Sequence, residues 1–176
     1  NEDAGVSDEA YQERERLHLY WVSSVAIVGL SSSSDVRDVQ VDARTVDDGQ
    51  PQRLYALLRG PLAPFPNLIQ SVAFLELPAG EDDGRYARVV DAVRVGTGPS
   101  KLEQVDLGER HLLLASCYDE GSIYVIDADT RQTMTVIREI SGPFDMQLDP
   151  ARQLLYVGDF RASVLRVIDL RGLVDR

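Results

Sequence analysis

Most residues that could do chemistry in this chain lie in short turn segments between hydrophobic runs. These segments read GTGPSK (96–101), CYDEGS (117–122), SGPFDM (141–146), DFRAS (159–163) and GPLAPFPNLIQ (60–70). Carboxylates, basic side chains and aromatic rings in turns can bind a ligand or a protein through charged hydrogen bonds and ring contacts. The sequence therefore predicts a binding site formed by Lys101, Tyr118, Asp119, Glu120, Asp145, Asp159, Phe160 and Arg161.

The same segments also have a purely structural interpretation. Gly98-Pro99 and Gly142-Pro143 are expected to shape turns, because proline fixes φ and glycine permits a positive φ. Asp119-Glu120-Gly121 is typical of a polar hairpin turn. Asp127 and Asp169 end hydrophobic runs and are expected to bind the backbone of the following turns.

Segment 60–70 offers a second kind of surface. Its three prolines predict a loop rather than a strand. Phe65, Leu68 and Ile69 lie in this loop and are the predicted contact residues for a protein partner. Apolar residues in a long loop more often pack over the sheet beside them, so that alternative stays open.

The sequence holds no recognisable catalytic or metal-binding motif. Its only histidines are His18 and His111, and His111 is expected to be exposed at the start of a strand. Cys117, the only cysteine, ends an apolar run and is expected to be buried and unreactive, which excludes a disulfide and a cysteine zinc site. A calcium site of turn carboxylates lacks an Asp-x-Asp-x-Asp-Gly loop, and Gly-x-Ser-x-Gly is also missing. We therefore predict no catalytic residue, no metal and no cofactor.

Composition narrows the class of protein further. The 176 residues are 44% hydrophobic, enough for the core of one domain. A formal net charge of -11 argues against nucleic acid as a partner, and no apolar run is long enough to span a membrane. Residues 1–16 are acidic and polar and are expected to be flexible or to form a short helix, so residues 17–176 should hold the fold.

A repeated frame places the turn segments in order. Val125-Ile126-Asp127 and Val167-Ile168-Asp169 are 42 positions apart (167 − 125), and the same offset places Tyr118 on Phe160. Gly98-Pro99 and Gly142-Pro143 are 44 apart (142 − 98), and the difference falls in a turn, where length changes are tolerated. A degenerate third copy over residues 53–76 carries the proline-rich segment as its extra length.

A period near 42 residues with four short strands per unit predicts the blades of a β-propeller. The fold class is therefore all-β, with roughly 2.7 blades over residues 36–95, 96–140 and 141–170. Because propellers close with about four to eight blades, we expect this chain to be part of a larger propeller. The predicted strands lie near 36–43, 53–59, 71–77, 88–95, 99–106, 110–117, 122–127, 133–140, 144–149, 153–159 and 164–169.

Two further structural expectations follow from the repeat. The segment HLYWVSSVAIVGL (18–30) has strand composition and is interpreted as a strand of a preceding blade. Strands 122–127 and 164–169 are expected to be central in their blades, with Ile123, Val125, Leu165 and Val167 packed between sheets.

The pattern G-x-x-P…LYV…VID resembles the YVTN family of surface-layer, PQQ-like propeller repeats. It is carried by GTGPSKLEQV, by HLLLASCYDEGSIYVIDADTRQTMTVIREI and by SGPFDMQLDPARQLLYVGDFRASVLRVIDL. The resemblance covers residues 96–170 well and 36–95 poorly, because the first copy has the proline-rich insertion and VVDAVRVG. It implies a periplasmic or extracellular setting, which the residues alone do not show.

Two functions remain open from the sequence. The first is a non-catalytic scaffold that contacts a protein partner, or the remaining blades in another polypeptide, within an envelope or extracellular assembly. The second is a propeller enzyme, similar to the lactonase or quinone-dependent dehydrogenase propellers, whose site is completed by further blades. One propeller fold hosts many activities, so the resemblance does not decide between them.

Overall fold

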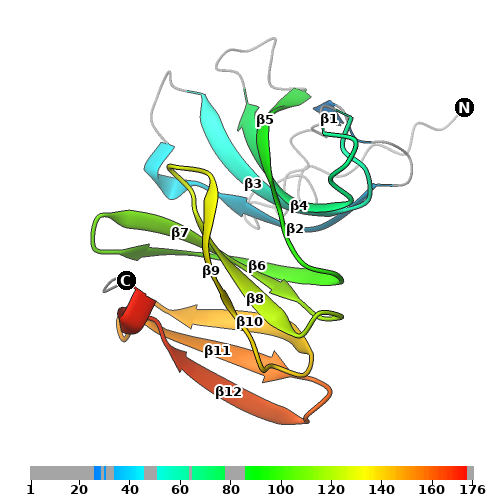
Figure 1. The fold of residues 1–176 in the computed structure, drawn as a ribbon. Coiled ribbons are helices and arrows are strands. Elements are labelled where there is room, and N and C mark those ends of the chain that lie inside the picture. Colours follow the sequence, from blue (N-terminus) through cyan, green and yellow to red (C-terminus); the bar gives the residue numbers. More distant parts are fainter. Residues whose placement is uncertain are drawn as a thin grey trace, which may run out of the picture.

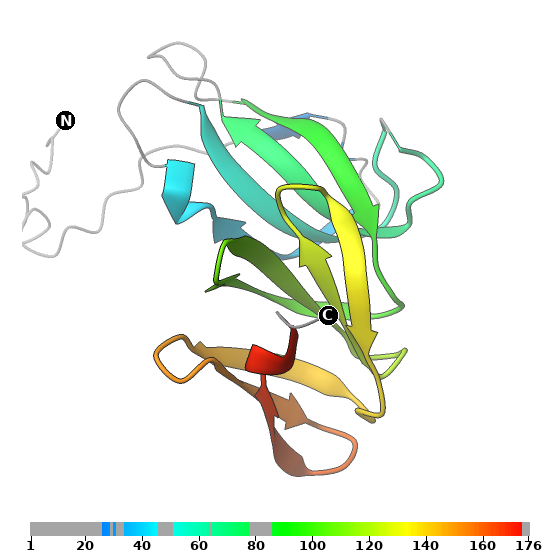
Figure 2. The same cartoon turned by 60° about the vertical axis from the view of Figure 1, so that its left-hand side comes forward.

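The computed structural model describes residues 26–28, 30, 34–45, 51–63, 65–77 and 86–173. Across these residues the protein is all-β, with three sheets that follow one another like adjacent blades (Figures 1 and 2). Its strands are β1 (Ala26–Val28), β2 (Asp35–Val41), β3 (Gln52–Arg59), β4 (Gln70–Leu77), β5 (Tyr86–Arg94), β6 (Pro99–Leu107), β7 (Arg110–Cys117), β8 (Ser122–Asp127), β9 (Gln132–Ile137), β10 (Pro143–Asp149), β11 (Leu154–Asp159) and β12 (Val164–Asp169). Two short 3-10 helices, η1 (Ala43–Thr45) and η2 (Arg171–Leu173), complete the described elements.

The three sheets confirm the predicted all-β fold and its division into blades. Blade one has the order β1-β5-β4-β3-β2, blade two β6-β7-β8-β9 and blade three β10-β11-β12. Strands β2 to β12 pair antiparallel within their sheets, and each corresponds to a predicted strand. The alternating Val, Ile and Leu positions form these strands because β-branched and apolar side chains pack well on a pleated surface.

One strand of each blade, β2, β6 and β10, lies on a common inner side, and we call these the inner strands. Strand β6 packs between β2 and β10, and each pair of neighbouring blades encloses an apolar core. The core between blades one and two includes Tyr55, Phe74 and Leu102. The core between blades two and three includes Val125 and Met146. Burial of these side chains between sheets is what holds the blades together, since apolar burial is the dominant favourable contribution to folding.

Each inner strand has a bulge near its start, at an equivalent position of the repeat. The pairing shifts at Arg37 in β2, at Ser100 in β6 and at Phe144 in β10. Two positions after each bulge stand Val39, Leu102 and Met146. Leu102 and Met146 are 0% and 3% exposed beneath the preceding blade, whereas Val39 of the first blade is 46% exposed. Coverage by a neighbouring blade therefore decides burial at this position.

The interpretation of 18–30 as a strand of a preceding blade is wrong for its described part. Strand β1 pairs parallel with the Tyr86–Arg88 part of β5 and so becomes a fifth strand of blade one. Ile27 and Leu30, with Leu62 and Phe65 of the proline-rich loop, pack on the outer apolar face of this blade. Predictions for residues 1–25 lie outside the described residues. No helix in the described part of the chain is long and apolar enough to cross a membrane.

The prediction that β12 is central and that Leu165 and Val167 are buried is also wrong. Strand β12 is the edge of its sheet among the described residues. We call the face of a blade toward the following blade its trailing face. On this face Ile123 and Val125 of blade two are fully buried by blade three, whereas Leu165 and Val167 are 65% and 55% exposed. Leu165 and Val167 are apolar like Ile123 and Val125, but no sheet among the described residues covers them.

Candidate functional site

Four predicted site residues, together with Phe144, gather where the turns of blades two and three meet. The ring centroid of Tyr118 lies 6.0 Å from that of Phe144 and 6.3 Å from that of Phe160. The Arg161 guanidinium stacks 4.4 Å from the Tyr118 ring centroid, and its Nη2 donates to Asp119 Oδ1 over 3.3 Å. We call Tyr118, Asp119, Phe144, Phe160 and Arg161 the aromatic turn cluster.

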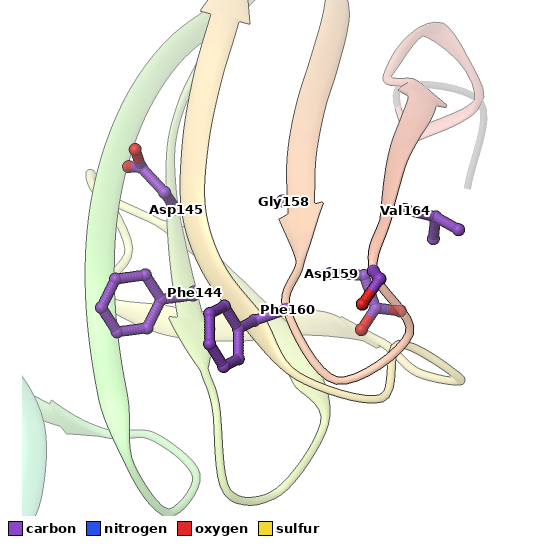
Figure 3. Close-up of a pocket in the computed structure, with 7 residues that line it drawn as sticks. Phe144, Asp145, Gly158, Asp159, Phe160 and Val164 are labelled. Atoms are coloured by element: carbon purple, nitrogen blue, oxygen red, sulfur yellow. The ribbon is translucent and has the colours of Figure 1, made fainter.

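An open pocket of about 450 Å³ adjoins this cluster on blade three. Phe144 and Phe160 lie side by side at one end of it, with ring centroids 6.1 Å apart (Figure 3). Both rings are more than half exposed, at 57% and 71%. Its lining residues are Phe144, Asp145, Gly158, Asp159, Phe160, Ser163 and Val164. Exposed aromatic rings beside a hollow are typical of a surface that contacts another molecule.

The two Gly-Pro turns reach the same position for different reasons. Gly98 has φ of 68°, and a Cβ there would lie 2.5 Å from the Asp119 carboxylate, so the predicted use of a positive φ is confirmed. Gly142 is not among the residues with positive φ. A Cβ at Gly142 would lie 2.9 Å from both Arg161 Cγ and Tyr118 Cε2. Glycine at 142 therefore gives the space in which Arg161 stacks on Tyr118.

Asp159 supports the cluster from beneath rather than facing solvent. Its carboxylate is 1% exposed, accepts backbone N–H groups from Ser141 and Gly142 over 3.1 and 2.9 Å, and pairs with Arg166 Nε at 2.7 Å. Burial by itself would raise the pKa of Asp159, but these hydrogen bonds outweigh it and hold the pKa below its ordinary value. Asp159 is thus placed to position the turn that carries Phe160.

We expect Asp159→Ala to lower the thermal midpoint by several degrees and to loosen the aromatic turn cluster. The variant leaves the Ser141 and Gly142 amides without their acceptor, and loss of the buried Gly142 bond alone costs about 1–3 kcal/mol. Thermal unfolding and the near-ultraviolet circular dichroism of the aromatic rings would measure both effects. Asp145→Ala, which changes an exposed carboxylate of the same pocket, is the control, and equal midpoints for the two variants would contradict this role.

A second group of charges lies along the inner strands. Lys101 Nζ pairs with Asp38 Oδ2 at 3.1 Å, and Asp38 Oδ2 also accepts the Leu102 backbone N–H over 2.9 Å. A hydrogen bond with Asp38 raises the pKa of Lys101, and the carboxylates of Glu103 and Asp145 raise it further. Burial raises the pKa of Glu103, and repulsion from Asp38 and Asp145 adds to it. The Lys101 ammonium is thus paired with a carboxylate of blade one and interacts electrostatically with carboxylates of blades two and three.

Sequence reasoning found Lys101 and Asp145 of this group and missed Asp38 and Glu103. The signal that could have found Asp38 is the residue just after the bulge, where Asp38, Lys101 and Asp145 are equivalent. Glu103 stands two positions after Lys101 on the same face of its strand. Among the described residues no group of three or more potential ligands is arranged to hold a metal ion.

The remaining predicted residues take separate positions. Glu120 accepts the Tyr124 hydroxyl proton over 3.1 Å and pairs with Arg138 at 3.5 Å. In the proline-rich loop Phe65 packs against the apolar face of blade one, whereas Ile69 is 60% exposed. Asp127 and Asp169 accept N–H groups of the following turns, which confirms their predicted role.

The predicted exposure of His111 is wrong, whereas the predicted burial of Cys117 is confirmed. His111 is 3% exposed, so the expectation of an exposed histidine is wrong: its ring packs beside Tyr55, and its Nδ1 lies 2.6 Å from Asp106 Oδ1. Blade one covers it, which the position at a strand start did not reveal. Cys117 is fully buried as predicted, and burial raises the pKa of its thiol to about 12. Such a thiol is a poor nucleophile at neutral pH.

Neither known family models nor curated proteins give a significant match to this sequence.

Proposed function

We propose that this chain is a non-catalytic scaffold segment of a larger, YVTN-type β-propeller that binds a protein partner through the trailing face of blade three. The observation that carries the proposal is the contrast between equivalent positions of two blades. Ile123 and Val125 are fully buried, whereas Leu165 and Val167 are more than half exposed. Leu165 and Val167 occupy the same places in the repeat as Ile123 and Val125, so they are suited to packing against another protein surface in the same way.

The aromatic turn cluster extends this uncovered face. Phe144 and Phe160 are exposed at the turn end of blade three, in a pocket that also includes Gly158, the pairing partner of Leu165. Contiguous exposed apolar surface of this kind marks interaction sites in soluble proteins. Arg161 and Asp119 at its margin add polar contacts, as in the rim of a protein interface.

The native mass of the protein tests this proposal. We expect a particle larger than the 19.5 kDa chain, and we expect Leu165→Asp with Val167→Asp to return it to the mass of one chain. Ala151→Asp adds one charge at an exposed turn outside the trailing face and should leave the larger mass unchanged. A particle of one chain at every concentration, from native cells as well as after recombinant expression, would overturn the proposal.

A further inference from the structure

His111 lies close to two carboxylates at the interface of blades one and two. It stands opposite Asp106 in the β6–β7 pairing, and its Nδ1 lies 2.6 Å from Asp106 Oδ1. Its other ring nitrogen, Nε2, lies 4.0 Å from Oδ1 of Asp42, which follows strand β2 of blade one. The ring therefore approaches one carboxylate of each blade.

The contact with Asp106 determines which ring nitrogen carries the first proton. An ionised carboxylate can only accept a hydrogen bond, so the 2.6 Å contact places an N–H on Nδ1. A neutral imidazole has a single N–H, so Nε2 then keeps a bare lone pair near the Asp42 carboxylate. This Nε2 is buried and has no hydrogen-bond partner among the described residues. A second proton, on Nε2, would give it an interaction with Asp42.

The charged groups around the ring favour this second proton. Carboxylates outnumber guanidinium groups four to two on the elements packed there, which carry Asp106 on β6, Asp42 and Arg44 at η1, Tyr55 on β3, Arg110 on β7, and Asp127 and Asp129 at the end of β8. The Tyr55 hydroxyl donates to Asp42, and Arg44 pairs with both Asp42 and Asp129. Burial of the ring acts against a charged imidazole, whereas the two carboxylates beside its nitrogens stabilise it.

We propose that His111 makes a pH-sensitive contact between blades one and two, in which the doubly protonated ring joins Asp106 to Asp42. Histidine is the side chain that ordinarily changes charge between about pH 5 and 8. Asp42 stays ionised through this range, because hydrogen bonds hold its pKa below the ordinary value. The unfolded chain offers no such pair of carboxylates, so the folded state binds the second proton more readily. The added stability is present below about pH 6.5 and is lost as pH rises.

Asp106→Asn in the full chain weakens this contact without opening the interface. The Asp106 side chain is 65% exposed, so the variant should still fold, and asparagine keeps a hydrogen-bonding oxygen but loses the charge. Between about pH 5.5 and about pH 8, we expect the thermal midpoint of the parent to fall by about 3 °C more than that of the variant. Glu109→Gln is the matched control, because it removes an exposed negative charge from the same β6–β7 turn and should keep the pH profile of the parent.

Nuclear magnetic resonance of isotope-labelled histidine reads the ring protons directly. The chain has two histidines, and a His18→Gln chain assigns the signals of His111. At about pH 6 we expect both His111 ring nitrogens to be protonated in the parent. A ring that carries a single proton at that pH would overturn the inference, and this readout needs no variant in the interface. Equal pH profiles for Asp106→Asn and Glu109→Gln would also overturn it, because the effect would then come from overall charge.

Discussion

Val125→Asp is expected to unfold blade two, whereas Val167→Asp is expected to leave the isolated chain folded. The two valines are 42 positions apart and occupy the same place in β8 and β12. Val125 is fully buried between two sheets, so the variant buries an unpaired carboxylate and loses apolar contact, at a cost of about 4 kcal/mol or more. For a chain of this size that is a fall of about 10 °C or more in the thermal midpoint.

The matched pair separates burial from residue type. Val167 is 55% exposed, so its replacement by Asp removes little apolar contact and leaves the carboxylate hydrated. Thermal unfolding and solubility of the two variants beside the parent chain give the measurement. Equal midpoints for Val125→Asp and the parent would show that β8 does not lie between two sheets, and the blade assignment would fail.

The sequence predicted the strands well because the signals for them are local. Runs of apolar residues between Gly-Pro, Asp-Gly and Asp-rich turns gave each strand from β2 to β12 within a few residues. The proline-rich segment was also predicted as a loop, since proline cannot donate to a ladder. Cys117 was predicted to be buried because it ends an apolar run, and the structure buries it fully.

What the sequence could not predict depends on neighbours far along the chain. Val125 and Val167 look alike in sequence, and only the presence of blade three over one of them decides which is buried. His111 looks exposed at a strand start, but Tyr55 of another blade packs against it. Asp38 was missed because its partner, Lys101, is 63 positions away (101 − 38), and because its equivalence to Lys101 depends on a bulge that only the strand pairing shows.

The second large effect is expected at Asp42, which lies at the interface between blades one and two, with its Oδ1 4.0 Å from His111 Nε2. This carboxylate is fully buried and accepts the Tyr55 hydroxyl proton over 2.7 Å, and Arg44 Nε lies 3.1 Å from its Oδ1. Asp42→Ala leaves a buried hydroxyl and part of a guanidinium unpaired, at a cost of about 3 kcal/mol. The control is Asp129→Asn, which weakens only the half-exposed pair of Asp129 with Arg44 and should cost less than about 1 kcal/mol.

Acid stability then tests the charge at Asp42 separately from its packing. Burial by itself would raise the pKa of Asp42, but hydrogen bonds from Arg44 and Tyr55 outweigh it and hold the pKa below its ordinary value. The folded state therefore binds this proton less readily than the unfolded chain. The stabilisation is complete above the ordinary carboxyl pKa of about 4 and is lost as pH falls through the lowered pKa. The gap in thermal midpoint between the parent and Asp42→Ala, measured between neutral pH and about pH 2, should narrow toward the acid end, whereas a constant gap would show that the carboxylate acts through shape alone.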